Sequence, residues 1–434
     1  MEAQGTRPLK ELFDDLKRLH QLGEFVAAGR VTGDFVIRLI DLLLTYGVQV
    51  GASDLHIEPA HEGARVRFRI DGALHELLEL PSEMSEPLIR SIKTRANLTS
   101  DAVGRSKPQD GRLDFTASGK SVDVRLSCFP AMHGDVLAMR LLLRSRSLYR
   151  LEQLGFHPKV MQQFFRSIHR PNGLLLVTGP TNSGKTTTLY AALEQLRSPR
   201  LKIVTLEDPV EYQLAGIDQA QINPQVGFTF ASGLRSILRQ DANIILVGEI
   251  RDVETAEIAI RAALTGHLVL STLHTRNACG AVTRLIEMGI EPYLILAVLN
   301  GVLGVRLVRH VCKNCRQPDA QAAAVYEHLM MKHGNSTEQH SMDAGKQTGM
   351  EFVKGAGCDA CNGSGYQGRS ALYEFLVLSD SLKEYVLTQN VRQLNKAAIA
   401  AGMRTMIRDG LEKASQGLTT IDEVLRVVGE SDDL

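Results

Sequence analysis

One segment of the chain has the residue types and spacing of a phosphate-binding loop. An apolar run ends in Gly179-Pro-Thr-Asn-Ser-Gly184-Lys185-Thr186, and helix-forming residues follow it, which is the order of strand, loop and helix that such a loop requires. Gly179 and Gly184 let the backbone curl so that successive N–H groups converge on phosphate oxygens, and the helix adds its positive N-terminal end. The pattern predicts a nucleotide site made by Gly179, Pro180, Thr181, Asn182, Ser183, Gly184, Lys185, Thr186 and Thr187.

Three side chains of this loop have distinct expected roles. Lys185 neutralises charge on the β- and γ-phosphates, the Thr186 hydroxyl holds Mg²⁺, and Thr187 is next in line to reach the α-phosphate. The expected cofactors are therefore ATP and Mg²⁺. The plainer alternative, a glycine-rich turn without a ligand, does not account for the apolar strand before the loop and the helix after it.

Two later apolar runs end in carboxylates. The run KIVTLEDPVEY reaches Glu207 and Asp208, where Pro209 stops the strand, and NIILVGEIRD closes in Gly248 and Glu249. Ligands of such sheets lie at the carboxyl ends of the strands. Glu249 therefore fits a Walker B element that orders Mg²⁺ or the attacking water. The alternative is that Glu249 is only an acidic residue at the start of a helix.

Two histidines accompany the next apolar run. The segment TGHLVLSTLHT has His267 before a strand and His274 near its end, on opposite faces of a regular strand. We favour His274 as a sensor of the γ-phosphate. For His267 a structural role and a role in the site fit equally well.

The cysteines indicate a metal site. Four of the six fall in two CxxC pairs, Cys312 with Cys315 and Cys358 with Cys361. Two thiolates on one turn can share a tetrahedral ion, and a second pair completes a structural zinc site of four cysteines. The alternative is four unligated thiols. The other two cysteines lie in apolar stretches and are expected to act as small buried hydrophobes.

The elements that must position these residues fall into blocks. Residues 1–30 predict a short helical segment, residues 31–146 a small α+β domain, and residues 147–434 an α/β domain whose apolar strands alternate with helices, as in a parallel sheet. Within the last domain we expect a zinc subdomain at about 310–366 and a helical part at about 376–434.

Local patterns define some of these elements further. A helical pattern runs from Phe35 to Tyr46, and ARVRFRIDGALHELLEL alternates like two strands joined by a turn at Asp71 and Gly72. The strand pattern continues in KSVDVRLSCFP and LAMRLLL. Farther along, Asp319–Met350 is rich in Ala, Gln, Ser, His and Met, which indicates a surface excursion with one helix.

The composition excludes several classes of protein. The chain has 434 residues, 44% of them hydrophobic, and 49 basic residues balance 49 acidic ones, so no overall positive field attracts nucleic acid. The longest nearly uncharged apolar run, Tyr293–Val305, is too short to cross a bilayer. No basic segment followed by an apolar one opens the sequence. We therefore expect a cytoplasmic protein with no nucleic-acid partner.

Together these segments resemble the type II secretion and type IV pilus assembly ATPases, the GspE/PilB family of secretion ATPases. The stretches that carry the resemblance are SDLHIEP, GPTNSGKTTTLY, EDPVEY, LRQDANIILVGEIRDVETAEIAIRAALTGHLVLSTLHT and GLTTIDEVLRVV. The resemblance implies an α/β fold with a RecA-like P-loop motor domain, preceded by a smaller PAS-like α+β domain and completed by a zinc-binding subdomain and a helical C-terminal segment.

The resemblance also implies a function, partners and a location. The protein would be a homohexameric motor that hydrolyses ATP to power assembly of a type IV pilus or a type II secretion pseudopilus. It would bind an inner-membrane platform protein of that system, and would be cytoplasmic and peripherally associated with the inner membrane through this partner. Two alternatives are a non-hydrolysing nucleotide-binding scaffold or regulator of the same machinery and a DNA-uptake or competence motor. The presence of Lys185, Thr186, Glu207 and Glu249 favours hydrolysis.

Roles for single residues follow from the same resemblance. Glu207 belongs to an Asp box, Glu249 is the catalytic glutamate of Walker B, and His267 and His274 form a His box. The family's usual QRLVR stands here as Val305–Arg309, with Val in place of Gln.

Arginines of the first domain are implied to reach the γ-phosphate. These are Arg112 in QDGR and Arg125 in VDVRLS. An arginine brought from outside the P-loop compensates the charge that develops during phosphoryl transfer. Arg235 and Arg239, beside Walker B, are the competing candidates within the motor domain.

Overall fold

A computed structural model describes the chain at residues 33–100, 107–117, 119–143, 149–333 and 350–429. These residues belong to two compact units, which divide between positions 147 and 148. The helical segment predicted for residues 1–30 lies outside the described residues.

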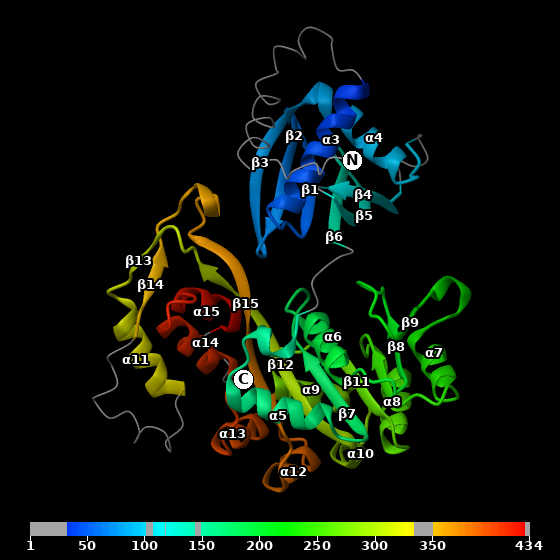
Figure 1. Cartoon of the computed structure of the whole chain (residues 1–434), viewed down its shortest axis with the longest axis vertical. Helices are drawn as coiled ribbons and strands as arrows, with labels where there is room; N and C mark the ends of the chain where they lie inside the picture. The colour runs from blue at the N-terminus through cyan, green and yellow to red at the C-terminus, as the bar shows by residue number, and fades with distance from the viewer. Residues whose placement is uncertain (1–32, 101–106, 118, 144–148, 334–349, 430–434) are drawn as a thin grey trace. The chain divides into compact units, whose positions relative to one another are not determined.

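The first unit is built on one antiparallel sheet of six strands, in the order β3-β2-β1-β6-β5-β4 (Figure 1). The strands are β1 (Asp54–Ala60), β2 (Gly63–Ile70), β3 (Ala73–Pro81), β4 (Gln109–Ala117), β5 (Lys120–Ala131) and β6 (Gly134–Leu143). The turn predicted between β2 and β3 is confirmed, with φ of 47° at Asp71 and 84° at Gly72. Positive φ at both central residues matches the twist of the flanking strands.

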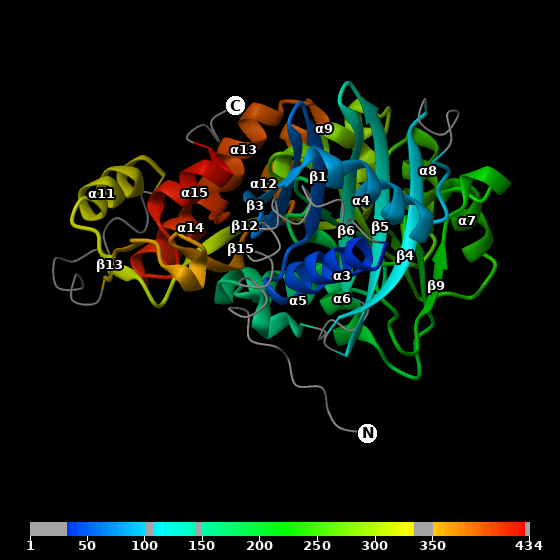
Figure 2. The same ribbon diagram turned by 90° about the horizontal axis from the view of Figure 1, so that it is seen from above.

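Two helices cover one face of this sheet. They are α3 (Gly33–Gln49), which contains the helix predicted from Phe35 to Tyr46, and α4 (Ser82–Arg95). The apolar residues of α3 recur at helical spacing and are buried: Val36, Leu39, Ile40, Leu43 and Leu44. Figure 2 shows both helices lying across the strands. The core fills this side, and Asp135 of β6 lies there too, bound to Lys93 of α4 at 2.7 Å. Arg112, Asp123 and Arg125 alternate with core residues and lie on the other face.

The second unit contains a sheet of seven strands, in the order β15-β12-β7-β11-β10-β8-β9. They are β7 (Gly173–Thr178), β8 (Ile203–Glu207), β9 (Asp218–Gln221), β10 (Ile244–Val247), β11 (Leu268–Leu273), β12 (Leu299–Val311) and β15 (Tyr366–Leu376). Six strands run parallel, which confirms the predicted parallel sheet, and β15 runs antiparallel to β12. After β12 the chain passes through α11 (Ala322–His333) and returns from the far end of that strand, so β15 runs back alongside β12 in the antiparallel direction.

Helices cover both faces of this second sheet (Figure 1). One face packs against α5 (Pro158–Ile168) and α6 (Lys185–Leu196), and the short turn η2 (Leu151–Leu154) lies on the same side. The other packs against α7 (Phe230–Ile237), α8 (Val253–Leu264), α9 (Ala278–Glu287) and α10 (Pro292–Val298). Every residue of β7 and β11 is buried, as expected of parallel strands covered on both sides.

The last part of the second unit is mostly helical. Two helices, α12 (Asp380–Leu387) and α13 (Val391–Ala400), join the core on the side of α8 and α9. A separate cluster on Val308 of β12 joins α14 (Met406–Ser415), α15 (Ile421–Val428) and α11 (Ala322–His333). The helix predicted within Asp319–Met350 is α11, and residues 334–349 lie outside the described part of the chain.

The two units confirm the predicted fold class, an α/β P-loop unit preceded by a smaller α+β unit. Cys128 is buried in the core of the first unit and Cys279 in that of the second, as predicted. The apolar run Tyr293–Val305 is divided between α10 and β12. Among the helices of the described residues, none is long and apolar enough to cross a bilayer.

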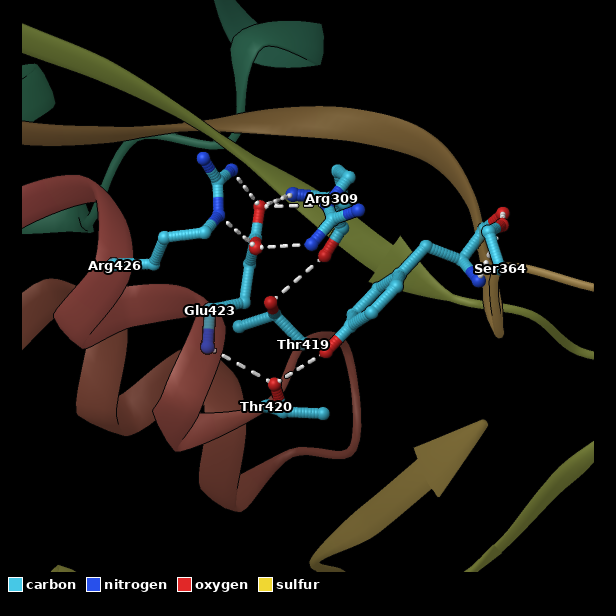
Figure 3. A network of polar contacts seen from close by, with 7 residues as sticks. Arg309, Ser364, Thr419, Thr420, Glu423 and Arg426 are labelled. Carbon is cyan, nitrogen blue, oxygen red and sulfur yellow. Dashed lines mark hydrogen bonds and ion pairs between the residues drawn. The ribbon is translucent and has the colours of Figure 1, made fainter. Parts of the chain in front are cut away.

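A buried carboxylate fastens α15 to the sheet (Figure 3). Glu423 accepts hydrogen bonds from Arg309 of β12, at 2.7 Å from Nη2 and 3.0 Å from Nε, and from Arg426, at 2.7 Å from both Nε and Nη2. The hydroxyl of Thr419 donates to the carbonyl of Arg309 at 2.7 Å. The guanidinium of Arg309 also stacks on the ring of Tyr366, 4.1 Å from its centroid. These contacts tie three elements that are distant in sequence.

The two guanidinium groups change the ionisation of this carboxyl. Burial alone would raise the pKa of Glu423, but the hydrogen bonds from Arg426 and Arg309 outweigh it and lower the pKa from 4.5 to about 2. A shift of this size corresponds to about 3 kcal/mol of stability. The contribution is complete above pH 4.5 and is lost as the pH falls toward 2.

We therefore expect Glu423→Gln to lower the stability of the second unit by about 3 kcal/mol at pH 7. The difference from the wild type should stay constant down to about pH 5 and shrink below pH 4.5, because the wild-type carboxyl then begins to lose its advantage. Thermal unfolding followed at pH 7.5, 6, 5, 4 and 3.5 measures this. Glu384→Gln, at an exposed position of α12, is the control and should match the wild type. A gap that is independent of pH down to pH 3.5 would contradict the prediction.

Candidate active site

The predicted phosphate-binding loop lies at the carboxyl edge of the second sheet. It joins β7 to α6, so that Lys185 is the first residue of the helix. Strand β7 is flanked by β11 on one side and β12 on the other. Residues that follow β10, β11 and β12 can therefore meet the loop, because the carboxyl ends of parallel strands share one edge.

Two glycines give the loop its shape. Gly184 has φ of 98° and forms the N-terminal boundary of α6, a conformation that favours glycine. Gly179 is closely packed: a Cβ atom there would lie 2.5 Å from both the Ser183 hydroxyl and the Val305 carbonyl oxygen. A larger residue at Gly179 would displace the backbone of β12. The loop therefore depends on the neighbouring strand as well as on its own sequence.

Lys185 is a buried cation that contacts its own loop. Its Nζ donates to the carbonyl oxygens of Gly179, at 2.9 Å, and Pro180, at 2.8 Å. Burial lowers the pKa of Lys185 to about 8, Arg306 acts in the same direction, and Glu249 opposes it. The ammonium group is thus held at the start of the loop by Gly179 and Pro180. Its pKa depends on nearby charges.

The remaining loop residues divide by exposure. Pro180, Thr181 and Asn182 are exposed at the tip, whereas Ser183 is buried. The first turn of α6 carries Thr186 and Thr187, both partly exposed. Their hydroxyls lie at the helix N-terminus, as the predicted roles at Mg²⁺ and the α-phosphate require.

Glu249 follows β10 and faces the same edge. Its Oε1 accepts a hydrogen bond from Arg251 Nη2 at 2.6 Å, and its Oε2 lies 3.4 Å from His274 Nε2. Partial burial raises the pKa of Glu249, but the hydrogen bond and charge of Arg251, together with His274, outweigh it and leave the pKa below its ordinary value. The carboxylate is therefore ionised at neutral pH and fixed from two sides.

His274 follows β11, directly beside the loop. Its backbone is held by the next residue, because Thr275 N–H donates to the Thr178 hydroxyl at 3.0 Å, and Thr178 is the last residue of β7. Burial and the charge of Lys185 lower the pKa of His274, against the opposing effect of Glu249. The imidazole is therefore neutral at pH 7. The imidazole lies 3.4 Å from Glu249, and the positive charge of Lys185 acts on it.

The structure separates the two histidines of the predicted His box. His267 lies just before β11 and His274 just after it, so they stand at opposite ends of the strand rather than on its two faces. The ring Nδ1 of His267 is 3.0 Å from the carbonyl oxygen of Ala262, at the end of α8. This contact with the backbone of α8 supports the structural role for His267, one of the two alternatives given above.

Glu207 is the last residue of β8, and both of its carboxylate oxygens accept hydrogen bonds. It accepts hydrogen bonds from Thr205 Oγ1 at 2.5 Å, from Gln219 Nε2 at 3.0 Å and from the Tyr190 hydroxyl. Only 3% of Glu207 is exposed. Burial, together with Glu207, strongly raises the pKa of Tyr190, so that its hydroxyl remains a donor. These hydrogen bonds join α6, β8 and β9.

Two arginines near the loop were not predicted as site residues. Arg251 holds Glu249 and also lies 3.9 Å from Asp208. Arg306, on β12, acts on the charge of Lys185. Signals for both were present: Arg251 stands two residues after Glu249 in NIILVGEIRD, and Arg306 lies in the segment that corresponds to QRLVR.

Arg112 and Arg125 lie in the first unit, on the charged face of its sheet. They are directly opposite each other on β4 and β5, and Arg125 is in turn opposite Arg140 of β6. Arg112 Nε donates to Asp123 at 2.5 Å, and Arg140 Nε donates to Asp54 at 3.1 Å. Like charges directly opposite on adjacent strands destabilise a sheet. Arg125 Nε also lies 3.9 Å from Asp123, so Asp123 and Asp54 offset part of the charge of this row of three arginines.

The competing arginines lie on and after α7. Arg235 forms an ion pair with Glu254 of α8, and Arg239 Nη1 donates to the carbonyl oxygen of Arg235 at 2.9 Å. Asn243, near the start of β10, accepts a hydrogen bond from Lys202 N–H at 2.8 Å. These contacts give each of the three residues a local role in the fold.

The two CxxC pairs meet in one cluster. The Sγ atoms of Cys312, Cys315, Cys358 and Cys361 all lie within 4.8 Å of one another. Three of the separations are 3.9, 3.8 and 3.7 Å. Four thiolates placed tetrahedrally about zinc at about 2.3 Å would be separated by about 3.8 Å. The four-cysteine cluster therefore fits a structural Zn²⁺ ion.

Backbone groups support this cluster. The N–H groups of Cys358 and Gly365 each lie 3.2 Å from Cys361 Sγ. The second CxxC pair brackets the turn η5 (Asp359–Cys361), and the short strands β13 (Arg316–Pro318) and β14 (Val353–Gly355) pair next to it. N–H donors to a thiolate stabilise its negative charge. All four positions belong to cysteine, so the site has no open position for substrate.

Comparison with known proteins identifies relatives over almost the whole chain. A family model described as "Type II/IV secretion system protein" matches residues 31–426. The chain is 44% identical over 396 residues to the type II secretion system ATPase E of Vibrio cholerae, which covers 91% of this chain and 76% of that protein. It is 42% identical over 430 residues to the type II secretion system protein HxcR of Pseudomonas aeruginosa, covering 99% and 84%. It is also 43% identical over 378 residues to the type IV pilus assembly ATPase PilB of Thermus thermophilus, covering 86% and 41%.

Solved structures share the fold. The pilus retraction motor PilT with bound ADP has a TM-score of 0.58 at 24% identity, covering 89% of this chain and 96% of that one. The ATPase DotB of Legionella pneumophila has a TM-score of 0.64 at 21% identity, covering 89% and 94%. At these identities the likeness concerns the fold alone.

The cysteine cluster predicts about one zinc ion per chain. We expect elemental analysis of protein purified without chelators to find it, and Cys312→Ser to lose it and to lower the thermal midpoint by about 5–10 °C. Cys279→Ser, which changes a buried thiol outside the cluster, is the control and should retain the metal. Wild-type protein with far less than one zinc per chain would contradict the prediction.

Proposed function

The chain belongs to the type II/IV secretion system protein family, and on that premise we propose that it is the motor that powers assembly of a type IV pilus or a type II secretion pseudopilus. It is an ATPase. The observation that carries the proposal is the meeting of Lys185, Glu249 and His274 at one edge of the second sheet. The contact of His274 with this carboxylate favours hydrolysis over a scaffold that only binds nucleotide, in which Glu249 would order Mg²⁺ alone.

Nucleotide binding is assigned to the loop and the first turn of α6. Lys185 exchanges the carbonyl oxygens of Gly179 and Pro180 for the β- and γ-phosphate oxygens, which are stronger partners for an ammonium group. The hydroxyls of Thr186 and Thr187 lie on the turn that follows. Mg²⁺ held by Thr186 would neutralise phosphate charge and orient the γ-phosphate.

Hydrolysis is assigned to Glu249. Its low pKa keeps it ionised, so it can orient the attacking water and accept its proton. Arg251 fixes one carboxylate oxygen, and His274 faces the other. Because His274 also lies within the electrostatic influence of Lys185, it is placed to report a bound γ-phosphate to Glu249.

Glu207 is given a supporting role in this scheme. Glu207 is only 3% exposed, and both of its oxygens already accept hydrogen bonds, from Tyr190, Thr205 and Gln219. A general base must have a free oxygen within reach of the water. The network of Glu207 therefore fixes the end of β8 next to the site, while Glu249 performs the proton transfer.

The first unit supplies charge for the transition state in this proposal. Arg112 and Arg125 carry the role of arginine fingers, within a ring of identical subunits. The placement of Arg112, Arg125 and Arg140 side by side on β4, β5 and β6 supports this, since neighbouring guanidinium groups could bind one phosphate group together. Residues 31–146 and 147–434 would then act as the two working domains.

The wider assembly is part of the same proposal. The protein would form a homohexamer, bind an inner-membrane platform protein, and associate with the membrane from the cytoplasmic side through that partner. A hexamer of one chain uses identical interfaces between neighbours and closes into a ring. Size measurement in the presence of a non-hydrolysable ATP analogue tests the ring.

Variants of Lys185 and Glu249 should separate nucleotide binding from hydrolysis. Lys185→Ala should abolish turnover and weaken nucleotide binding, because it removes the cation at the phosphates. Glu249→Gln should leave binding intact and lower kcat by about 10²- to 10⁴-fold, because the amide cannot accept the proton from water. Both are measured by phosphate release and by titration with a fluorescent ATP analogue.

Glu257→Gln is the matched control. Glu257 is an exposed residue of α8 that lies 3.8 Å from Arg261, and the variant should retain wild-type turnover. Near-normal ATPase activity of Glu249→Gln would transfer the catalytic role to Glu207.

Variants of four arginines should locate the arginine finger. Arg112→Ala and Arg125→Ala should each lower kcat by about 10³-fold or more while retaining nucleotide binding. Arg235→Ala and Arg239→Ala should have small effects.

Arg90→Ala, which removes an exposed ion pair with Glu86, is the control for the first unit. Normal turnover in both variants at Arg112 and Arg125, with loss in those at Arg235 and Arg239, would assign the finger to the motor domain.

A further inference from the structure

Arg306 occupies a special place on β12. The strand pairs with β7 as far as Gly304 opposite Thr178, the last residue before the phosphate-binding loop. The next two residues, Val305 and Arg306, therefore lie beside the loop itself. Arg306 is only 8% exposed, so a permanent charge is buried at this position.

The guanidinium contacts both the loop and a second segment. Nη1 donates to the carbonyl oxygen of Val305 at 3.0 Å and would be 3.1 Å from a Cβ atom on Gly179. Nη2 donates to the carbonyl oxygen of Arg276. One planar group thus lies next to the first glycine of the loop and bonds to the segment that follows β11.

That second segment carries His274. It runs from His274 to Asn277, whose side chain caps α9 by accepting from Gly280 N–H at 2.8 Å. Thr178 holds its near end through Thr275, with Oγ1 atoms 2.6 Å apart, and Arg306 holds its far end. Thr178 Oγ1 also donates to the carbonyl oxygen of Leu273 at 3.0 Å. His274 therefore lies between Leu273, which is held by Thr178 of β7, and Arg276, which is held by Arg306 of β12.

The chemistry of the anchor favours arginine. A guanidinium donates from separate nitrogens in fixed directions, whereas an ammonium is a point charge on a flexible stem. Burying such a charge is costly unless it is well bonded. A polyphosphate in the adjacent loop would offset part of that cost, which makes the contact most favourable in the state that hydrolyses.

We propose that Arg306 is a positioning residue, which holds the His274 segment against the phosphate-binding loop so that His274 faces Glu249. The inference rests on the proposed function and adds a specific coupling to it. Arg306 acts through His274 and not on the phosphate directly. A change in the shape of the loop at Gly179 is then passed to the histidine 3.4 Å from the catalytic carboxylate.

A double-mutant cycle on the full-length protein tests this. Arg306→Met should lower kcat roughly 10- to 100-fold while the Kd for a non-hydrolysable ATP analogue changes by less than about threefold. In the background of His274→Ala, the same change should lower kcat by no more than about twofold, because the residue through which it acts is gone. Arg306→Lys should recover part of the loss.

Arg309→Met is the matched control. It makes the same substitution on the same strand and breaks the contact with Glu423, so it should lower the thermal midpoint and show no coupling to His274. A purely structural role for Arg306 would give the same independent behaviour in both cycles, which would overturn the inference.

Other outcomes are equally decisive. Wild-type kcat in Arg306→Met, or in His274→Ala, would also overturn the inference while leaving the ATPase assignment intact. Absence of turnover in the wild type under the same conditions would instead overturn the proposed function. If Arg306→Met does not fold, Arg306→Lys is used in the cycle, and additive losses with His274→Ala would again overturn the inference.

Discussion

A buried ammonium group sets the conditions for the whole nucleotide site. Lys185 is held by two carbonyl oxygens of its own loop, and the charged groups that act on it are Glu249 and Arg306. Two buried cations beside one partly buried carboxylate leave a surplus of positive charge, which favours a polyphosphate. Glu207 accepts its hydrogen bonds from the neutral side chains of Tyr190, Thr205 and Gln219, and it is not among the charged groups that act on Lys185.

Parallel pairing brings these groups together. Strands β7, β10 and β11 end at one edge of the sheet, and β12 continues past it beside the loop. The residues at this edge therefore meet although they are far apart in sequence. The four parallel strands are buried on both faces and packed by helices, and this rigid layer fixes distances such as the one between His274 and Glu249. The cysteine cluster is attached to the same sheet, because β12 ends at Val311 and Cys312 is the next residue.

The parts of the site that lie in one continuous segment were predictable from sequence. The loop from Gly179 to Thr187 and the two CxxC pairs have fixed local spacing, so their chemistry is visible in the residues alone. Arg306 was different, because its role depends on which strand pairs with β7 and in which register. The closed network of Glu207 also escaped prediction, since its partners come from other elements. The antiparallel return of β15 could not be inferred from a pattern of apolar strands.

The end of β12 concentrates three separate requirements in a short stretch. Arg306 lies at the nucleotide loop, Arg309 at the buried carboxylate of α15, and Cys312 in the cysteine cluster. Side chains alternate along a strand, so inserting or deleting one residue would turn the following side chains to the opposite face. A length change between Arg306 and Cys312 would therefore damage the zinc site and the C-terminal anchor at once. The number of residues between these positions is therefore constrained as strictly as the residues themselves.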